Sequence, residues 1–274
     1  MASEDIPKVV LFDIGGVCVL SPFQAILDYE KSLAIPPGYI NFCISKSAPN
    51  GQWHKLERGE IPLDTSFFAG FTEDLNNPQM WQAFQARLQA TSKASKHGNP
   101  EVTWSLAKSQ PRIDGEDLFW KMMAASRSPD PNIYPALKHL KASKKFVVAA
   151  LSNTVIFPQG HPYNTAGQED VRNMFDLFVS SAHVGMRKPD SKIYEYTLQK
   201  LAELVGRRGE QLQAKDVVFL DDIGENLKAA RNAGMRTIRV VLGKTDDAVR
   251  QLAAVTGMPL PDPGVGLGEV RSKL

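Results

Sequence analysis

The chain has 274 residues, of which 43% are hydrophobic and 23% charged, so it can bury a large core and is not disordered as a whole. Lysine and arginine number 32 against 30 aspartate and glutamate residues, and this balance argues against a basic nucleic-acid-binding face. No apolar run approaches the roughly 18 residues that a membrane-spanning helix needs, so we expect a soluble protein.

Both ends of the sequence bear on its compartment. The N-terminus, MASEDIPK, is polar and lacks the apolar stretch of a secretory signal, and the chain contains only two cysteines, which indicates a reducing, intracellular compartment. Residues 272–274 read SKL, the tripeptide that peroxisomal import receptors recognise at a free C-terminus. We therefore expect peroxisomal import through that receptor, and a cytoplasmic location if the SKL ending is coincidental.

Five short apolar segments, each bounded by polar or turn residues, predict buried β-strands. They span residues 8–12, 146–151, 177–181, 217–220 and 237–241. Beyond residue 130 they alternate with helical patterns at 134–141, 168–174, 192–205 and 225–233, the last of which ends at Gly234. This alternation is typical of an α/β fold built on a doubly wound parallel sheet with right-handed crossovers.

The first and second predicted strands are separated by about 130 residues, whereas a crossover needs only about a dozen. Helical spacing at 23–71 and 78–88 predicts a helical module inserted there, with a solvated loop at 91–116. We predict a Rossmann-like core of residues 1–20 and 128–260, a helical cap of residues 21–127 and a flexible C-terminal tail of residues 261–274.

The ligand site of an open parallel sheet lies at the carboxyl ends of its strands, so polar residues that follow the strands are candidates for function. Six residues occupy such positions: Asp13, Ser152, Asn153, Lys188, Asp221 and Asp222. Three of them are carboxylates from two strand ends, a set that can bind one hard cation such as Mg²⁺. Lysine and serine can hold phosphate oxygens, and Asp13 can attack phosphorus to give an aspartyl-phosphate.

The segments that carry these residues, LFDIGGV, ALSN, RKPD and FLDDIGEN, resemble the four motifs of the haloacid dehalogenase (HAD) superfamily. Within it, the sequence is most similar to the N-terminal, phosphatase-type domain of soluble epoxide hydrolases. The likeness rests on VGMRKP, on FLDDIGENLKAARNAGM and on the cap-like stretch GQWHKLERGEIP at 51–62. We expect no counterpart of the second, α/β-hydrolase domain of those enzymes, so the resemblance does not imply epoxide opening.

The resemblance assigns a role to each motif residue. It implies a catalytic nucleophile at Asp13 and a catalytic lysine at Lys188. The Mg²⁺ ligands would be Asp13, Asp221, Asp222 and the backbone carbonyl of Gly15. Phosphate-binding residues would be Ser152, Asn153, Lys188 and Gly16, and Asn226 would orient the loop that carries Asp221 and Asp222.

Gly15 departs from the family pattern. Phosphatases of the family usually have a second aspartate at this position, which protonates the leaving alcohol and later activates water. Glycine keeps the carbonyl for the metal but lacks the acid and base, whose help is worth roughly 10²- to 10⁴-fold. The sequence therefore predicts a slow or specialised enzyme.

We predict a Mg²⁺-dependent phosphatase or phosphotransferase acting on a small organic phosphate. One alternative is an isoprenoid diphosphate cyclase or diphosphate-processing enzyme, because some fungal family members resemble such cyclases and DDIGE matches the DDxxE pattern of terpene synthases. Another is a catalytically impaired ligand-binding protein, which Gly15 favours and Asp13 opposes. Metal-free dehalogenation fits poorly, because Asp221 and Asp222 are both intact.

Substrate choice is expected to lie in the cap, which can close over the strand ends and exclude water. Trp53, His54 and Arg58 are candidates for substrate contact there, with burial in the cap core as the alternative for the aromatic residues. Cys18 is expected to be a small buried hydrophobic residue rather than a reactive thiol.

Overall fold

The structure is a computed structural model that describes residues 6–94, 110–164 and 170–261. The SKL tripeptide at 272–274 and nearly all of the predicted tail lie outside these residues. Within the described ranges, no helix has both the length and the apolar character to cross a membrane. The chain divides into a sheet unit of Met1–Ser21, Glu57–Gly59 and Ser126–Leu274 and a helical unit of Pro22–Leu56 and Glu60–Ala125.

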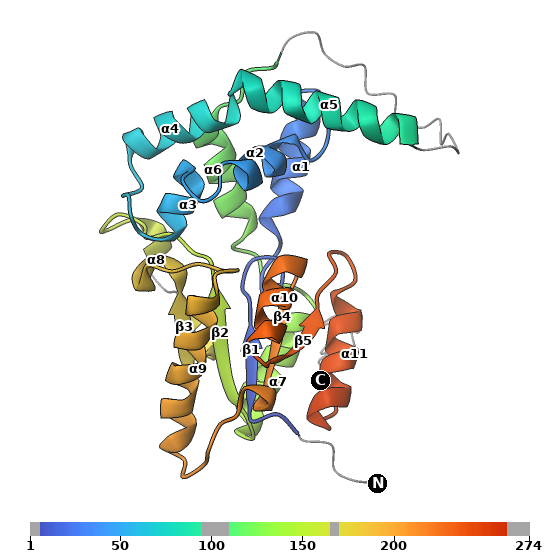
Figure 1. Cartoon of the computed structure of the whole chain (residues 1–274). Coiled ribbons are helices and arrows are strands. Elements are labelled where there is room, and N and C mark those ends of the chain that lie inside the picture. Colours follow the sequence, from blue (N-terminus) through green and yellow to red (C-terminus); the bar gives the residue numbers. More distant parts are fainter. Residues whose placement is uncertain (1–5, 95–109, 165–169, 262–274) are drawn as a thin grey trace, which may run out of the picture. The chain divides into compact units, whose positions relative to one another are not determined.

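The sheet unit contains five parallel strands in the order β3-β2-β1-β4-β5, with β1 at the centre (Figure 1). The strands are β1 (Val9–Phe12), β2 (Val147–Ser152), β3 (Leu177–Ser180), β4 (Val217–Asp221) and β5 (Arg236–Arg239). Each predicted strand is present, with ends shifted by one or two residues, and the predicted doubly wound α/β fold is confirmed. β2 and β4 extend to Ser152 and Asp221, which are buried although they are polar.

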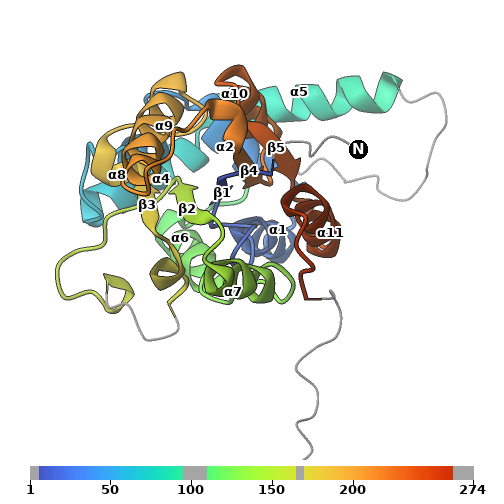
Figure 2. The ribbon, with the colours of Figure 1, turned by 90° about the horizontal axis from the view of Figure 1, so that it is seen from below.

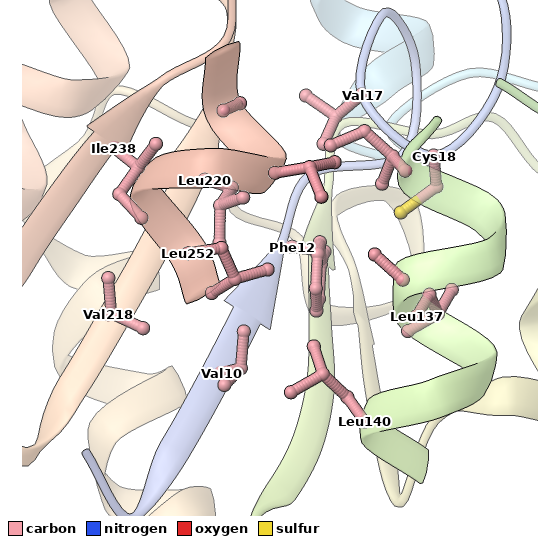
Figure 3. Close-up of a cluster of buried hydrophobic side chains, with 14 of the residues drawn as sticks. Val10, Phe12, Val17, Cys18, Leu137, Leu140, Val218, Leu220, Ile238 and Leu252 are labelled. Atoms are coloured by element: carbon pink, nitrogen blue, oxygen red, sulfur yellow. The ribbon is translucent and has the colours of Figure 1, made fainter. Parts of the chain in front are cut away.

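Helices cover both faces of the sheet (Figure 2). They are α7 (Ile133–Ser143), α9 (Ser191–Gly206), α10 (Gly224–Asn232) and α11 (Thr245–Thr256). Val10 and Phe12 of β1 belong to the core beneath α7 and α11, and Figure 3 shows them beside Leu137, Leu140 and Leu252. The alternate residues Val9 and Leu11 belong to the core beneath α9 and α10. Burial on both faces explains why the strands read as continuous apolar runs.

Three segments of the sheet unit differ from the sequence prediction. The predicted helix at 168–174 is, in its described part, a 3₁₀ turn, η2 (Val171–Met174), because Asp170 caps the amide of Arg172 and Phe175 is already extended before β3. The short α8 (Ser181–Val184) and α11 were not expected. α11 is amphipathic, with Ala248, Val249 and Leu252 buried, but its many polar residues weaken the apolar pattern.

The helical unit contains α1 (Pro22–Ser32), α2 (Tyr39–Lys46), α3 (Gln52–Glu57), α4 (Thr65–Leu75), α5 (Pro78–Ala94) and α6 (Gly115–Ala125). Glu57 itself belongs to the sheet unit. The segment expected as a loop, 91–116, contains the end of α5 and the start of α6, and residues 95–109 are not described. The core of the helical unit is aromatic. The ring centroid of Trp53 lies 5.6 Å from that of Phe71, and His54 is buried in the same unit. Arg58 belongs to the sheet unit.

Candidate active site

Asp13 and Asp221 lie next to each other because the central strands end together. Phe12 is aligned with Leu220, and the amide of Asp13 donates a hydrogen bond of 2.8 Å to the carbonyl of Leu220. Asp221 follows Leu220 on β4 and is fully buried, and Asp13 is 6% exposed. Two carboxylates are thus withdrawn from water at the carboxyl edge of a parallel sheet, where ligands bind in this fold class.

Lys188 places its ammonium group between these two carboxylates. Its Nζ lies 2.8 Å from Asp13 Oδ1 and 2.7 Å from Asp221 Oδ2, and its side chain is 1% exposed. The same Nζ lies 5.3 Å from the centre of the Phe219 ring. Burial by itself would lower the pKa of Lys188, but the charges of Asp13 and Asp221 outweigh it and raise that pKa. The lysine is therefore held in its charged form at the site.

Asn153 fixes the backbone of Lys188. Its Oδ1 accepts a hydrogen bond of 2.8 Å from the Lys188 amide, and its Nδ2 donates one of 3.1 Å to the Lys188 carbonyl. The side chain that the sequence comparison assigned to phosphate thus has both ends of its amide engaged with another residue. In this structure its contacts are those of a residue that positions the lysine loop.

Asn226 holds the carboxylate of Asp221 from the other side. Its Nδ2 lies 3.1 Å from each oxygen of Asp221, whose Oδ1 also accepts a hydrogen bond of 2.8 Å from the amide of Ile223. Asn226 is itself held by Tyr194, whose hydroxyl donates to the Asn226 carbonyl at 2.9 Å. Tyr194 was not singled out from the sequence, because a tyrosine in an amphipathic helix looks like an ordinary core residue.

Asp13, Asp221 and Asp222 form a cluster that could hold a metal ion. One oxygen from each lies within 4.8 Å of the others. The Oδ1 of Asp222 is buried and has no hydrogen-bond partner among the described residues. Burial, then the charges of Asp13 and Asp221, raises the pKa of Asp222 to about 8, and burial raises the pKa of Asp13 to about 6. Three carboxylates with one ammonium group among them keep an excess of negative charge, and such a set of oxygen donors fits a hard divalent cation such as Mg²⁺.

The turn after β1 places two glycines beside this cluster. Of the two, Gly16 is the one with a positive φ, 76°, and its amide donates to the Val19 carbonyl at 3.0 Å. That amide is thus engaged within the turn rather than directed to a ligand. Gly15 forms a β-bridge with Val19. Cys18 is buried, and burial raises the pKa of its thiol, as expected for a small core residue.

Ser152 lies at the end of β2, beside Ser180 of β3, with which it is aligned. It is 3% exposed, and the contact of its hydroxyl among the described residues is a long one of 3.4 Å to the Asn153 carbonyl. A row of polar side chains that the sequence analysis missed continues from this edge. Thr154 Oγ1 lies 2.5 Å from Ser180 Oγ, which lies 2.7 Å from His183 Nδ1. Ser180 and Ser181, at the end of the predicted third strand, are the polar residues that could have indicated this row.

Comparisons with known proteins identify the family to which this chain belongs. Residues 7–234 match the haloacid dehalogenase-like hydrolase family. The chain is 29% identical to mouse bifunctional epoxide hydrolase 2 over 93% of this chain and 40% of that protein. It is 24% identical to sesquiterpene phosphatase astK of Aspergillus oryzae, over 83% of this chain and 87% of that protein. It is 39% identical to drimenol cyclase drtB of Aspergillus calidoustus over 34% of this chain and 16% of that protein.

Four curated relatives match over more than nine tenths of the chain, which spans only 19% to 40% of their own lengths. A crystal structure of a dehalogenase with an intermediate complex has the same fold, with a TM-score of 0.50 and 16% identity over 86% of this chain and 85% of that one. The resemblance to soluble epoxide hydrolases noted in the sequence is confirmed as a distant relationship over most of the chain. The family match covers more than half of the sequence, and the chain belongs to the haloacid dehalogenase-like hydrolases.

Proposed function

We propose that this protein is a Mg²⁺-dependent phosphatase that hydrolyses a small organic phosphate through an aspartyl-phosphate on Asp13. The observation that carries the proposal is the position of Lys188 Nζ, within hydrogen-bonding distance of Asp13 and Asp221, beside the partnerless oxygen of Asp222. A fixed cation and a carboxylate cluster are the parts that phosphoryl transfer needs.

The contacts of Asp13 select the attacking oxygen. Its Oδ1 accepts hydrogen bonds from the Ile14 amide at 2.7 Å and from Lys188 at 2.8 Å. Among the described residues, both contacts fall on Oδ1, so Oδ2 is the oxygen available to attack phosphorus. In the first step the bond from Oδ2 to phosphorus forms and the ester bond from phosphorus to oxygen breaks. The leaving group departs with the bonding electron pair as an oxyanion. Water then attacks phosphorus, which releases inorganic phosphate and regenerates Asp13, and the proton that the water gives up neutralises the released oxyanion.

Lys188 and Ser152 would hold the phosphate oxygens during both steps. The lysine is preorganised, because its backbone is held by Asn153 and its ammonium by two carboxylates, so little reorganisation accompanies the reaction. Asp13, Asp221 and Asp222 would hold Mg²⁺, which supplies charge neutralisation for the transferred group. We further propose that the helical unit acts as the cap that governs substrate access.

Gly15 restricts the substrate. With no carboxylate at this position, the leaving group receives no proton from it, so substrates whose leaving group is stable as an anion should react fastest. Aryl phosphates and acyl phosphates meet this condition. A diphosphate ester also meets it, because its leaving group is a phosphate monoester.

A second candidate is hydrolysis or cyclisation of an isoprenoid phosphate or diphosphate. The observation that favours it is a set of exposed apolar residues, 38% to 46% accessible, in the loops that follow the carboxyl ends of four strands: Leu20, Ile156, Ile223, Val241 and Leu242. Apolar side chains exposed in the loops at the carboxyl edge of the sheet suit a substrate with an apolar body. The named activities of astK and drtB fit the same substrate chemistry.

The two candidates are separated by one assay. The full chain is incubated with p-nitrophenyl phosphate, an alkyl phosphate or farnesyl diphosphate, each in excess MgCl₂ and in EDTA, and phosphate, diphosphate and cyclised product are quantified. Magnesium-dependent release of phosphate from the small esters supports the first candidate. Turnover confined to farnesyl diphosphate supports the second candidate. The absence of turnover on all three substrates refutes both candidates.

A further inference from the structure

Three residues from within the helical sequence belong to the sheet unit. The segment Glu57–Gly59 is flanked on both sides by residues of the helical unit, yet its contacts place it with the strands. The Glu57 carbonyl accepts a hydrogen bond of 2.6 Å from Ser181 Oγ at the start of α8. Gly59, with φ of 64°, approaches α8 so closely that a Cβ would lie 2.2 Å from the Ala182 carbonyl oxygen. The segment Glu57–Gly59 therefore packs closely against α8, directly after β3.

The side chain of Glu57 reaches from this segment to the loop that carries Lys188. One carboxylate oxygen, Oε2, accepts a hydrogen bond of 2.8 Å from Arg187 Nε and forms an ion pair with Arg187 Nη2 at 2.7 Å. The two side chains are 9% and 21% exposed, so water screens the pair only weakly. Arg187 directly precedes Lys188, and Asn153 holds Lys188 itself. The lysine loop is therefore fixed at two successive residues.

A buried ion pair is weak evidence for stability, because the cost of desolvating two charges offsets their attraction. What such a pair adds is a defined geometry, since the planar guanidinium fits a carboxylate in few orientations. Here the geometry is imposed one residue from a lysine whose Nζ must lie within 2.7 to 2.8 Å of two carboxylates. A shift of about 1 Å at such a site can cost about 10²-fold in rate.

We propose that Glu57 and Arg187 are positioning residues for Lys188: through Arg187, Glu57 fixes the loop so that the Lys188 ammonium stays where it can bind a phosphate group. This inference rests on the proposed role of Lys188 as phosphate ligand. It assigns a function to a carboxylate outside the four sequence motifs, in a segment that the sequence places within the cap.

The test is a double-mutant cycle of Glu57→Gln, Arg187→Gln and the double variant in the full chain. Inorganic phosphate binding is measured by calorimetry at saturating MgCl₂, together with Mg²⁺ binding alone and kcat and KM for p-nitrophenyl phosphate. Each single variant should weaken phosphate binding and lower kcat/KM about 10-fold, and the double variant should be no worse than either single variant. Mg²⁺ affinity should change less than phosphate affinity, because the backbone that carries the proposed Mg²⁺ ligands is held by β1 and β4 and not by the lysine loop.

Two further variants distinguish positioning from stability. Asp170→Asn removes a comparable arginine pair in the same unit, where Asp170 binds Arg172, and should leave phosphate affinity within 2-fold of the wild type. Arg187→Lys keeps the positive charge but cannot make the contacts of both Nε and Nη2 with Glu57. This variant replaces a glutamine variant that fails to fold. Its phosphate affinity should also fall several-fold.

The outcomes separate this inference from the proposed function. If the Glu57 and Arg187 variants melt at lower temperature but bind phosphate as tightly as the wild type, the pair is structural only and the inference is wrong. Strictly additive losses in the cycle would also overturn it, since the two residues would then act independently. If the wild type binds phosphate with magnesium but hydrolyses no ester, the proposed function fails while the phosphate-binding comparison still decides the inference.

Discussion

Gly16 leaves room for the carboxylate of Asp222. A Cβ on Gly16 would lie 2.4 Å from Asp222 Oδ2 and 3.3 Å from Ser21 Oγ, and the backbone of Gly16 has a φ of 76°. The motif after β1 and the motif after β4 are thus matched sterically as well as electrostatically. This contact gives Gly16 a steric role, and the phosphate-binding role that the sequence resemblance implies stays a prediction.

Gly16→Ala should therefore displace Asp222 and weaken Mg²⁺ binding by about 10-fold or more. The reason is that one of the three carboxylates of the proposed metal site would no longer lie close to the other two. The positive φ adds a cost of about 1 to 3 kcal/mol in the free energy of unfolding. Gly209→Ala is the matched control, since Gly209 has a φ of 77° and nothing within 4 Å of its added Cβ. Calorimetry and urea unfolding on both variants should show similar destabilisation but a metal defect only at Gly16.

Asp13→Asn should abolish turnover and leave a folded protein that still binds inorganic phosphate with magnesium. An amide has the shape of the carboxylate but is a very poor nucleophile, and Lys188 keeps its contact with Asp221. Asp247→Asn, on the exposed face of α11, is the control for losing one negative charge from the same unit. Activity in the Asp13 variant comparable with that of the control would contradict covalent catalysis by Asp13.

The stability of the metal-free protein should decrease as pH rises. The pKa of Asp222 increases from 3.8 to about 8 and that of Asp13 from 3.8 to about 6, in both cases chiefly through burial. The folded state then binds more protons than the unfolded state between these values, so the free energy of unfolding falls across that window. The slope is at most about 1.4 kcal/mol per pH unit for each group.

Urea unfolding in EDTA at intervals from pH 5 to pH 8 measures this slope. Asp222→Asn does not titrate at position 222 and should lose less stability, above all between pH 6 and pH 8. Excess MgCl₂ should flatten the wild-type curve, because the cation binds the ionised carboxylates. Parallel wild-type and variant curves in EDTA would show that Asp222 is not the group responsible.

Much of the fold and of the site was predictable because both depend on local sequence. Strands buried on both faces, such as residues 9–12, must be continuously apolar, and the polar residue that follows each one necessarily lies at the ligand edge of the sheet. Asp13 and Asp221 were found in this way. α11 was missed because its buried face is partly made of threonine and alanine, which weakens the apolar pattern. α6 was missed although Leu118, Phe119 and Met122 are buried on it, because its first residues were assigned to the solvated loop at 91–116.

Contacts between distant segments could not be read from the sequence. Nothing near Asn153 shows that its amide is satisfied by the backbone of Lys188, 35 residues away. Equally, Glu57 and Arg187 are 130 residues apart, and their pairing depends on the packing of the segment Glu57–Gly59 against α8. Motif matching assigns residues to a site, but the partner of each polar atom is decided by tertiary packing.

The prediction with the most direct bearing on chemistry is Gly15→Asp, which places a carboxyl group two residues beyond the proposed nucleophile. Of the two described glycines of this turn, the positive φ belongs to Gly16, so an aspartate at position 15 does not meet the same backbone strain. If proton transfer to the leaving group limits turnover, the variant should hydrolyse an alkyl phosphate roughly 10-fold or more faster than the wild type. The gain on p-nitrophenyl phosphate should be smaller, because p-nitrophenolate leaves without protonation.

Gly15→Asn, similar in size but with no acid, should give no gain on either ester. Initial rates on both esters, with thermal melts of all three proteins, test this. A folded Gly15→Asp variant with an unchanged ratio of the two rates would show that the enzyme is not limited by a missing acid, and would favour substrates, such as diphosphates, whose leaving group needs no proton.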